Sequence, residues 1–367
     1  MKEDKTVIDN SHRYCVIMCG GIGARFWPYS RTALPKQFID FFGTGRTLLQ
    51  MTYDRISRLV NPSNIIAVTN GMYAPLVREQ LPELPPENVL YEPTRRNTAP
   101  CVAWAAHHIQ ALDPEASMIV TPSDHLITRE NEFEAAVREG FAFVESNDAL
   151  LTLGVKPTRL ETAYGYIQTG KHIQGNISKV KTFTEKPDIK LAEVFVSTGE
   201  FFWNAGIFMW TAANFLSALE AYCPEVAAAF DQGTDVYGTP AETAFIAKAF
   251  PACPAISIDY AVMEKAQNVY VETVSFGWND LGTWGALYDN SPKNRQGNVT
   301  QNCNVLAYNA TGNILAVRGN KLVVIDGLEN FIIADSGDVL LICPKSHEQQ
   351  IRQMVNDAKV NFGDKFL

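Results

Sequence analysis

Apolar stretches alternate with helical patterns along most of the chain. Tyr14 to Cys19 is apolar without alternation, which is typical of a strand buried on both faces of a parallel sheet. Further strands are predicted at residues 64–69, 88–91, 117–121, 150–155 and 269–275. Apolar residues recur with helical spacing between them, at residues 48–60, 73–80, 101–112 and 132–144. This order predicts an α/β fold with a mainly parallel sheet and right-handed crossovers.

The pattern changes in the last part of the chain, from about residue 298. Short apolar runs such as NVLAYNA and KLVVIDG recur roughly every eight to eleven residues with Gly or Asn turns, which predicts a small all-β unit. Two helices are predicted before it, at 212–230 and 239–249, and one after it, at 348–360. We expect a polar N-terminal extension, an α/β domain and a β domain, at residues 1–13, 14–290 and 291–367.

Composition narrows the class of protein. The 367 residues are 46% hydrophobic and carry a net charge of −9, with a pI near 5.3, which argues against nucleic acid or an anionic membrane as partner. No apolar run has the length of a signal peptide core or of a membrane span, so a soluble cytoplasmic protein is expected. The seven cysteines are scattered without CxxC pairs, and we expect reduced, mostly buried thiols rather than a zinc site.

A glycine turn follows the first strand and is followed by cations. Gly20, Gly21 and Gly23 let the backbone N–H groups approach an anion, and Arg25 and Lys36 come soon after, which favours a phosphate cradle. A dinucleotide fingerprint is excluded because the third glycine is missing, and the Gly-Lys pair of a Walker A loop is absent. An ordinary strand-turn-helix connection with solvated cations is the plainer interpretation.

The segment GGIGARFWPYSR, followed by LPKQF, resembles the signature of sugar-nucleotide pyrophosphorylases, and its Phe-Trp-Pro form resembles the bacterial mannose-1-phosphate guanylyltransferases. Cys19 departs from the alanine usual in the family, although both residues are small and apolar. The resemblance implies a Rossmann-like, GT-A-like nucleotidyltransferase domain followed by a short β-helix-like domain. The phosphomannose isomerase domain of bifunctional relatives is not expected.

Two further segments carry polar residues at expected strand ends. EPTRRNTAP resembles the family's nucleotide pocket at Glu92, Asn97 and Thr98, although Asn97 is equally well explained as a helix N-cap. Asp124, after Ser123, follows the strand at 117–121, at the carboxyl edge where ligands of parallel sheets gather. A carboxylate there suits Mg²⁺, whereas a turn cap is the plainer interpretation.

Three short segments combine hydrogen-bonding residues with Gly or Pro: YGYI, FTEKP and FWNAGIF. Taken singly, each is better explained as a turn. As an ordered set they resemble the family's sugar-phosphate site, which implies sugar-phosphate-binding roles for Tyr164, Gly165, Glu185, Lys186 and Asn204. The segment SIDYAVMEK also resembles the family, with Asp259 and Tyr260 supporting this pocket, although Asp259 is equally well a cap.

The motif WNDLGTW supplies Asp280, which by resemblance shares Mg²⁺ with Asp124. The implied reaction joins mannose 1-phosphate to GTP, giving GDP-mannose and pyrophosphate, and a homodimer is expected. The implied catalytic residues are Arg25, Lys36, Asp124, Lys186 and Asp280. The implied nucleotide-binding residues are Gly20, Gly21, Gly23, Arg25, Lys36, Glu92, Asn97, Thr98 and Ser123.

Two alternatives stay open from the sequence. One is a pyrophosphorylase for another hexose 1-phosphate or another base. The other is a catalytically silent regulatory homologue that binds a sugar nucleotide, against which the joint presence of the implied catalytic residues counts. A nicotinamide-dependent oxidoreductase is disfavoured because the glycine spacing is wrong.

Overall fold

The computed structural model describes residues 10–21, 23–319 and 321–367, which form two compact units. The first unit consists of residues 10–19, 53–122 and 127–278. The second consists of the described parts of 20–52, 123–126 and 279–367, so the glycine turn belongs to the same unit as the C-terminal strands. The domain boundary expected near residue 290 stays a prediction.

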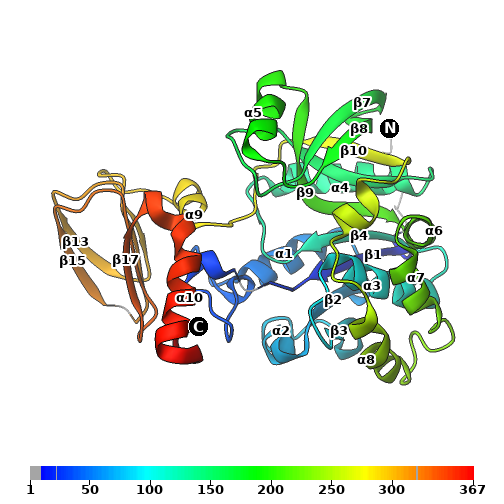
Figure 1. Ribbon diagram of the computed structural model, residues 1–367, viewed down its shortest axis with the longest axis horizontal. Coiled ribbons are helices and arrows are strands. Elements are labelled where there is room, and N and C mark those ends of the chain that lie inside the picture. The colour runs from blue at the N-terminus through cyan, green and yellow to red at the C-terminus, as the bar shows by residue number, and fades with distance from the viewer. Residues whose placement is uncertain (1–9, 22, 320) are drawn as a thin grey trace, which may run out of the picture. The chain divides into compact units, whose positions relative to one another are not determined.

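The first unit is built on a nine-stranded sheet with the order β3-β2-β1-β4-β9-β6-β10-β8-β7 among the described residues (Figure 1). Parallel pairs join β3 to β2, β2 to β1, β1 to β4 and β6 to β10, whereas β9 runs antiparallel between β4 and β6. The strands are β1 Arg13–Met18, β2 Ile65–Asn70, β3 Val89–Glu92, β4 Ser117–Pro122, β6 Leu150–Val155, β7 Tyr166–Gln174, β8 Ile177–Thr184, β9 Phe201–Thr211 and β10 Val269–Val274. The predicted α/β class is confirmed, although the sheet is mixed because β9, β8 and β7 run antiparallel to their neighbours.

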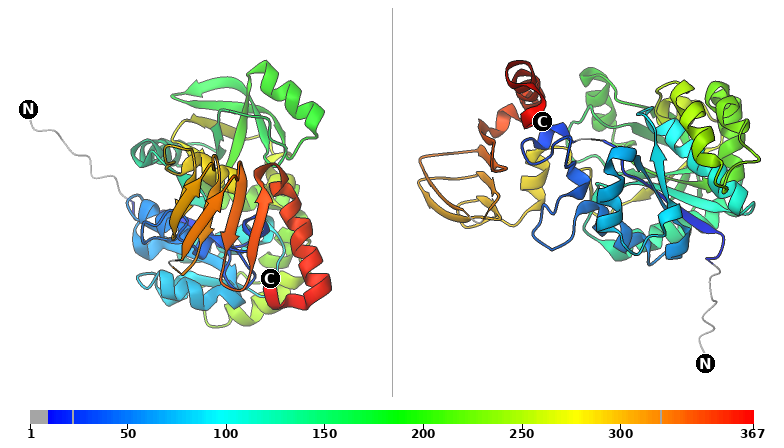
Figure 2. Two further views of the ribbon diagram at one scale, coloured as in Figure 1. Left: turned by 90° about the vertical axis from the view of Figure 1, so that its left-hand side faces the viewer. Right: turned by 90° about the horizontal axis from the view of Figure 1, so that it is seen from below.

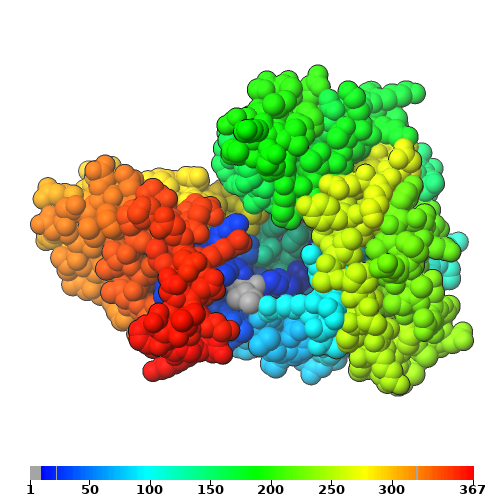
Figure 3. All heavy atoms as spheres, viewed as in Figure 1, coloured from blue at the N-terminus to red at the C-terminus, as the bar shows by residue number. Residues whose placement is uncertain are grey.

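Helices connect these strands. They are α1 Leu48–Ile56, α2 Ala74–Gln80, α3 Thr98–Leu112, α4 Glu130–Val144, α5 Ile189–Thr198, α6 Ala212–Tyr222, α7 Pro224–Asp231 and α8 Glu242–Ala252. The single helix predicted at 212–230 is wrong: α6 ends before Cys223 and α7 starts at Pro224, because proline lacks the N–H that an unbroken helix would need there. Figure 3 shows α7 and α8 on an outer surface of this unit. None of the helices in the described part of the chain is long and apolar enough to cross a membrane.

Both faces of the central strands are covered. On β1, Tyr14 and Val16 pack into a core with Val102 and Trp104 of α3, while Cys15 and Ile17 on the opposite face are also fully buried. Residues 14–19 therefore lack alternation because both faces of this strand are buried, as predicted.

The second unit contains the predicted C-terminal β structure, which Figure 2 shows from two sides. A sheet of β12, β14, β16 and β17 and a sheet of β13 and β15 are formed by β12 Val299–Gln301, β13 Asn304–Tyr308, β14 Ile314–Val317, β15 Leu322–Asp326, β16 Phe331–Asp335 and β17 Leu340–Pro344. Leu315 and Ile333 pack between the two sheets, while Ile314 and Ile332 pack with Phe26. Helices α9 Trp284–Asn290 and α10 Ile351–Phe362 flank the strands, and the two short strands β5 Leu126–Ile127 and β11 Trp278–Asn279 lie at unit boundaries.

Candidate active site

The glycine turn is shaped by two requirements at Gly21 and Gly23. Both have left-handed backbone angles, with φ of +91° and +64°, a region that residues with a Cβ rarely adopt. A Cβ on Gly23 would also lie 2.8 Å from Cγ of Lys36, so this glycine lets the lysine stem pass. A Cβ on Gly20 would meet no atom within 4 Å. The turn therefore determines where Lys36 lies.

Lys36 joins residues that are far apart in the sequence. Its Nζ lies 2.9 Å from Oδ2 of Asp124 and donates to the backbone oxygens of Asp280, at 2.9 Å, and of Leu281, at 3.3 Å. The lysine is buried, with 9% of its surface exposed. We call Arg25, Lys36, Asp124 and Asp280 the Lys36 junction. The carboxylate of Asp124 and the backbone of Asp280 thus meet at one ammonium group, while a metal site shared by the two carboxylates stays a prediction.

Arg25 and Ser123 complete the surroundings of the Lys36 junction. Nη1 of Arg25 would lie 3.3 Å from a Cβ on Gly282, whose N–H donates to Oδ1 of Asp280 at 3.1 Å. Within the described residues, Nε of Arg25 and Oγ of Ser123 are buried and have no hydrogen-bond partner. The two cations and the unsatisfied donors in one unit suit a bound polyphosphate.

The segment predicted to read the base lies in the first unit, at the start of α3. Asn97 is the N-cap: its Oδ1 accepts from the N–H of Thr98 at 2.9 Å, so the plainer interpretation holds. Oγ1 of Thr98 accepts from the N–H of Ile258 at 2.9 Å. Glu92 is buried, and burial raises its pKa to about 7, partly offset by a hydrogen bond with Cys101. Their role in nucleotide binding stays a prediction.

The three sugar segments meet in the first unit around Asn204. Its backbone N–H donates to the carbonyl of Gly165 at 2.8 Å, and its Nδ2 donates to Oδ1 of Asp259 at 2.9 Å. Its Oδ1 accepts from Oγ1 of Thr152 at 2.8 Å. A Cβ on Gly165 would lie 2.6 Å from Oε2 of Glu185. We call Thr152, Gly165, Glu185, Asn204 and Asp259 the Asn204 network.

Charged groups line this network. Lys186 bonds to Oε1 of Glu185, and its N–H donates to the carbonyl of Tyr164 at 3.2 Å. Burial would lower the pKa of Lys186, but the hydrogen bond and charge of Glu185 outweigh it and raise the pKa. Burial, together with the charge of Glu185, raises the pKa of Asp259. A carboxylate, an ammonium and an amide around a bare glycine suit sugar hydroxyls and a phosphate.

Two members of this region were missed by the sequence reasoning. Thr152 is fully buried in the strand LLTLGV, where one hydroxyl among apolar residues is a usable signal. Glu264, in the segment SIDYAVMEK, accepts from the N–H of Glu185 at 2.7 Å. Nothing in its spacing pointed to that contact, because it joins residues 79 apart.

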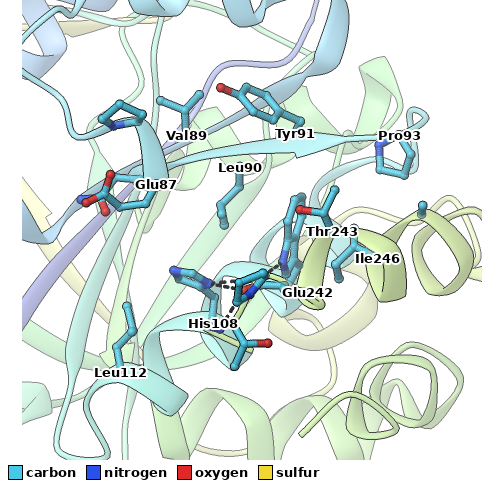
Figure 4. Close-up of a pocket in the computed structure, with 17 residues that line it drawn as sticks. Glu87, Val89, Leu90, Tyr91, Pro93, His108, Leu112, Glu242, Thr243 and Ile246 are labelled. Carbon is cyan, nitrogen blue, oxygen red and sulfur yellow. Dashed lines mark hydrogen bonds and ion pairs between the residues drawn. The ribbon is translucent and has the colours of Figure 1, made fainter. Parts of the chain in front are cut away.

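A separate cavity of about 530 Å³ in the first unit lies between β3, α3 and α8. Figure 4 shows Glu242 joined to His108 in this cavity. Oε1 of Glu242 also accepts from Nε1 of Trp104 at 2.6 Å, and Oε2 accepts from the N–H of Gly238 at 2.8 Å. The buried carboxylate is therefore fully bonded, and none of the predicted site residues lines the cavity.

Comparisons with known proteins show which family the chain belongs to. The family model described as nucleotidyl transferase matches residues 14–297. A mannose-1-phosphate guanylyltransferase from Salmonella typhimurium is 36% identical over 351 residues, covering 94% of this chain and 72% of that protein. A putative mannose-1-phosphate guanylyltransferase from Vibrio cholerae is 34% identical over 94% of this chain and 74% of that protein.

A solved structure is similar along almost the whole chain. It is titled mannose-1-phosphate geranyltransferase from Thermus thermophilus and superposes with a TM-score of 0.85 at 29% identity, covering 95% of this chain and 99% of that one. The sequence motifs, the family model and the similarity of fold all agree. The chain belongs to the nucleotidyl transferase family, and within it the chain is related to the mannose-1-phosphate guanylyltransferases.

Proposed function

We propose that the protein transfers GMP from GTP to α-D-mannose 1-phosphate, giving GDP-mannose and pyrophosphate. The observation that carries the choice of substrates is the 34–36% identity, over 94% of this chain, to relatives named mannose-1-phosphate guanylyltransferases. The family match supports nucleotidyl transfer as the type of reaction.

The proposed chemistry needs no general base. An oxygen of the sugar phosphate attacks the α-phosphorus of GTP, and the bond from that phosphorus to the pyrophosphate oxygen breaks. The second pKa of a phosphate monoester is about 6, so the nucleophile is already an anion at neutral pH. The difficulty is to bring two anions together in line, which is work for cations and backbone donors.

We assign the phosphates of GTP to the Lys36 junction. Lys36 and Arg25 would hold the departing pyrophosphate, with backbone N–H groups of Gly20, Gly21 and Gly23 as further donors. Three oxygens hold the ammonium of Lys36, which supports a fixed rather than a mobile charge. A fixed charge stabilises a transition state without reorganising.

Nucleotidyltransferases of this family use a divalent metal ion, and we assign Mg²⁺ to Asp124 and Asp280. The residues fit this ion, because Mg²⁺ takes hard oxygen ligands and is commonly held by one or two carboxylates together with substrate phosphates. Asp124 and the backbone of Asp280 contact the same ammonium group, which supports a shared role. When bound, Mg²⁺ would neutralise charge on the reacting phosphates.

We assign mannose 1-phosphate to the Asn204 network and its neighbours. Glu185 would accept hydrogen bonds from sugar hydroxyls, Lys186 would pair with the sugar's phosphate, and Asn204 would lie along the ring with Tyr164 and Gly165. Glu92, Asn97 and Thr98 are assigned to the nucleotide. The exposed side chain of Lys186 and the buried one of Glu185 support this division of work.

Pyrophosphate release by the purified chain tests the proposal. GTP, ATP, UTP and dTTP are each combined with mannose 1-phosphate and glucose 1-phosphate, with Mg²⁺ or with EDTA. GTP with mannose 1-phosphate is expected to give the highest kcat/KM, by about 100-fold, and only with the metal. A faster pair would reassign the substrates. Release with no pair would favour a homologue that only binds sugar nucleotides. Light scattering on the same sample tests the expected homodimer.

A further inference from the structure

A second cavity in the first unit has a volume of about 470 Å³. It lies between one face of α4, the end of β10 and the turn that joins β7 to β8. Its polar and aromatic lining is Glu132, Glu139, Lys156, Asn176, Phe202 and Glu272. None of these residues is assigned to GTP, mannose 1-phosphate or metal, so the cavity needs its own explanation.

Glu272 is the unusual member of this lining. It is 1% exposed, and within residues 10–21, 23–319 and 321–367 no group donates a hydrogen bond to its buried Oε2. Its strand is paired on both sides, opposite Leu153 of β6 and Ile177 of β8, so the backbone cannot carry the carboxyl group to solvent. Burial, helped by the charge of Glu139, raises the pKa of Glu272 to about 9. A buried carboxyl group facing a cavity without a partner is costly unless something binds there.

The charges around the cavity select the sign of a ligand. Of the three acids in the lining, Glu132 is already paired with Arg129 at 2.9 Å, which leaves Glu139 and Glu272 facing one cation of the lining, Lys156. Lys156 is already engaged: its Nζ donates to the carbonyl of Gly199 and lies 5.0 Å from the centre of the Phe202 ring. Glu139 accepts only a 3.3 Å bond from the N–H of Asn176 in the described chain. The lining is therefore suited to a cation.

The remaining lining selects an organic cation. Ala135, Ala136 and Phe276 give the cavity apolar walls, which suit methylene groups and not the water shell of an inorganic ion. Positively charged nitrogen on an aliphatic chain matches both features.

We propose that this cavity binds a small aliphatic amine, with its ammonium group between Glu272 and Glu139. The ammonium pairs with the carboxylate form of Glu272, so binding releases the proton that Glu272 carries at neutral pH to solvent. The inference rests on this cavity alone and does not depend on the substrates proposed above.

Calorimetric titration of the full chain with 1,4-diaminobutane tests the proposal. We expect saturable binding to one site at pH 7, with release of about one proton, measured in two buffers of different ionisation enthalpy. Affinity should rise by up to about tenfold from pH 7 to 8. Neutral butane-1,4-diol should not bind. Absence of saturable binding of the diamine would overturn the proposal.

Variants locate the binding. Glu272→Gln has the shape of the protonated acid and should fold normally while weakening diamine binding at least tenfold, and Glu139→Gln should weaken it as well. Glu193→Gln, on the exposed face of α5, is the matched control and should bind as the parent does. Undiminished binding by Glu272→Gln, or equal loss in the control, would refute the site. Nα-acetyl-lysine methylamide represents a lysine side chain of a protein. If it binds more tightly than the diamine, the ligand is such a side chain, and the proposal of a small free amine is overturned.

Discussion

The Lys36 junction and the Asn204 network are built in opposite ways. The junction lies on turns and loop ends, and its central ammonium contacts one carboxylate and two backbone oxygens. Nε of Arg25 and Oγ of the nearby Ser123 have no partner within the described chain. The network lies on paired strands, and its central amide uses Oδ1, Nδ2 and the backbone N–H in hydrogen bonds.

The two sites therefore differ in which of their polar groups stay available to a ligand. At the junction, three oxygens hold the ammonium of Lys36 in place, while Nε of Arg25 and Oγ of Ser123 stay available to phosphates, so the site need not reorganise during a reaction. An amide on a strand that is bonded through both Oδ1 and Nδ2 holds one geometry, which is what selection of a sugar requires. The comparison therefore predicts that changes at the junction act on kcat, and changes in the network act on KM for the sugar phosphate.

The largest expected effect is at the aspartates of the junction. Asp124→Asn and Asp280→Asn keep the side-chain shape but remove a charge, and each should lower kcat about 100- to 1,000-fold. KM for mannose 1-phosphate should change little. Steady-state pyrophosphate release measures both constants, and Glu193→Gln serves as the unaffected control. A variant of either aspartate with near-normal kcat would remove that residue from the catalytic site.

Substitutions at Gly23 and Gly20 distinguish two reasons why the turn contains glycine. Gly23→Ala forces a Cβ into left-handed backbone and against the stem of Lys36, so kcat should fall about 10- to 100-fold with a loss of stability of about 1–2 kcal/mol. Gly20→Ala meets no atom within 4 Å, so stability should not change. Its KM for GTP should rise several-fold if the bare backbone approaches phosphate. An unchanged KM would exclude Gly20 from the phosphate cradle.

Thr152 tests the network without touching a proposed ligand contact. Thr152→Val keeps the shape but removes one of two donors to Oδ1 of Asn204, the other being the N–H of Gly206, so the amide is held less firmly. KM for mannose 1-phosphate should rise about tenfold while kcat and KM for GTP stay near normal. Thr152→Ser, which restores the hydroxyl, should recover most of the loss. A lower apparent kcat with both KM values unchanged would mean that Thr152 acts on stability alone.

The sequence predicted the parts of the molecule that depend on local pattern. The hydrophobic pattern predicts the strands at 14–19 and 150–155. The capping residue Asn97 predicts the start of a helix. Pro224 is also a local signal for a helix break, although the apolar pattern continues on both sides of it and by itself predicts one helix.

Contacts across long separations could not be predicted in the same way. Resemblance to the family implies that Asp124 and Asp280 act together. The contacts of both residues with the ammonium of Lys36 depend on the fold and have no local signal. The contact of Glu264 with the backbone of Glu185 has no local signal either. Local propensity places each segment, and only packing decides which polar groups then meet.

The smallest expected effect is on the pH dependence of the free energy of unfolding. It concerns two buried glutamates of the first unit, Glu272 and Glu242. Glu272 has a pKa raised to about 9, so it stays protonated in the native state while the unfolded chain ionises near pH 4.3. The unfolded state then binds fewer protons, and the free energy of unfolding falls as pH rises from about 4.3 to about 9.

Glu272→Gln removes this dependence. Its free energy of unfolding relative to the parent should therefore increase by about 1–3 kcal/mol between pH 6 and pH 8, measured by urea denaturation. Glu242 gives the opposite sign: burial would raise its pKa, but the hydrogen bond and charge of His108 outweigh it and lower the pKa. Glu242→Gln should thus cost stability at neutral pH, because the native state has lost a bonded carboxylate. Parallel pH profiles for the parent and Glu272→Gln would show that the carboxyl group of Glu272 has a partner after all.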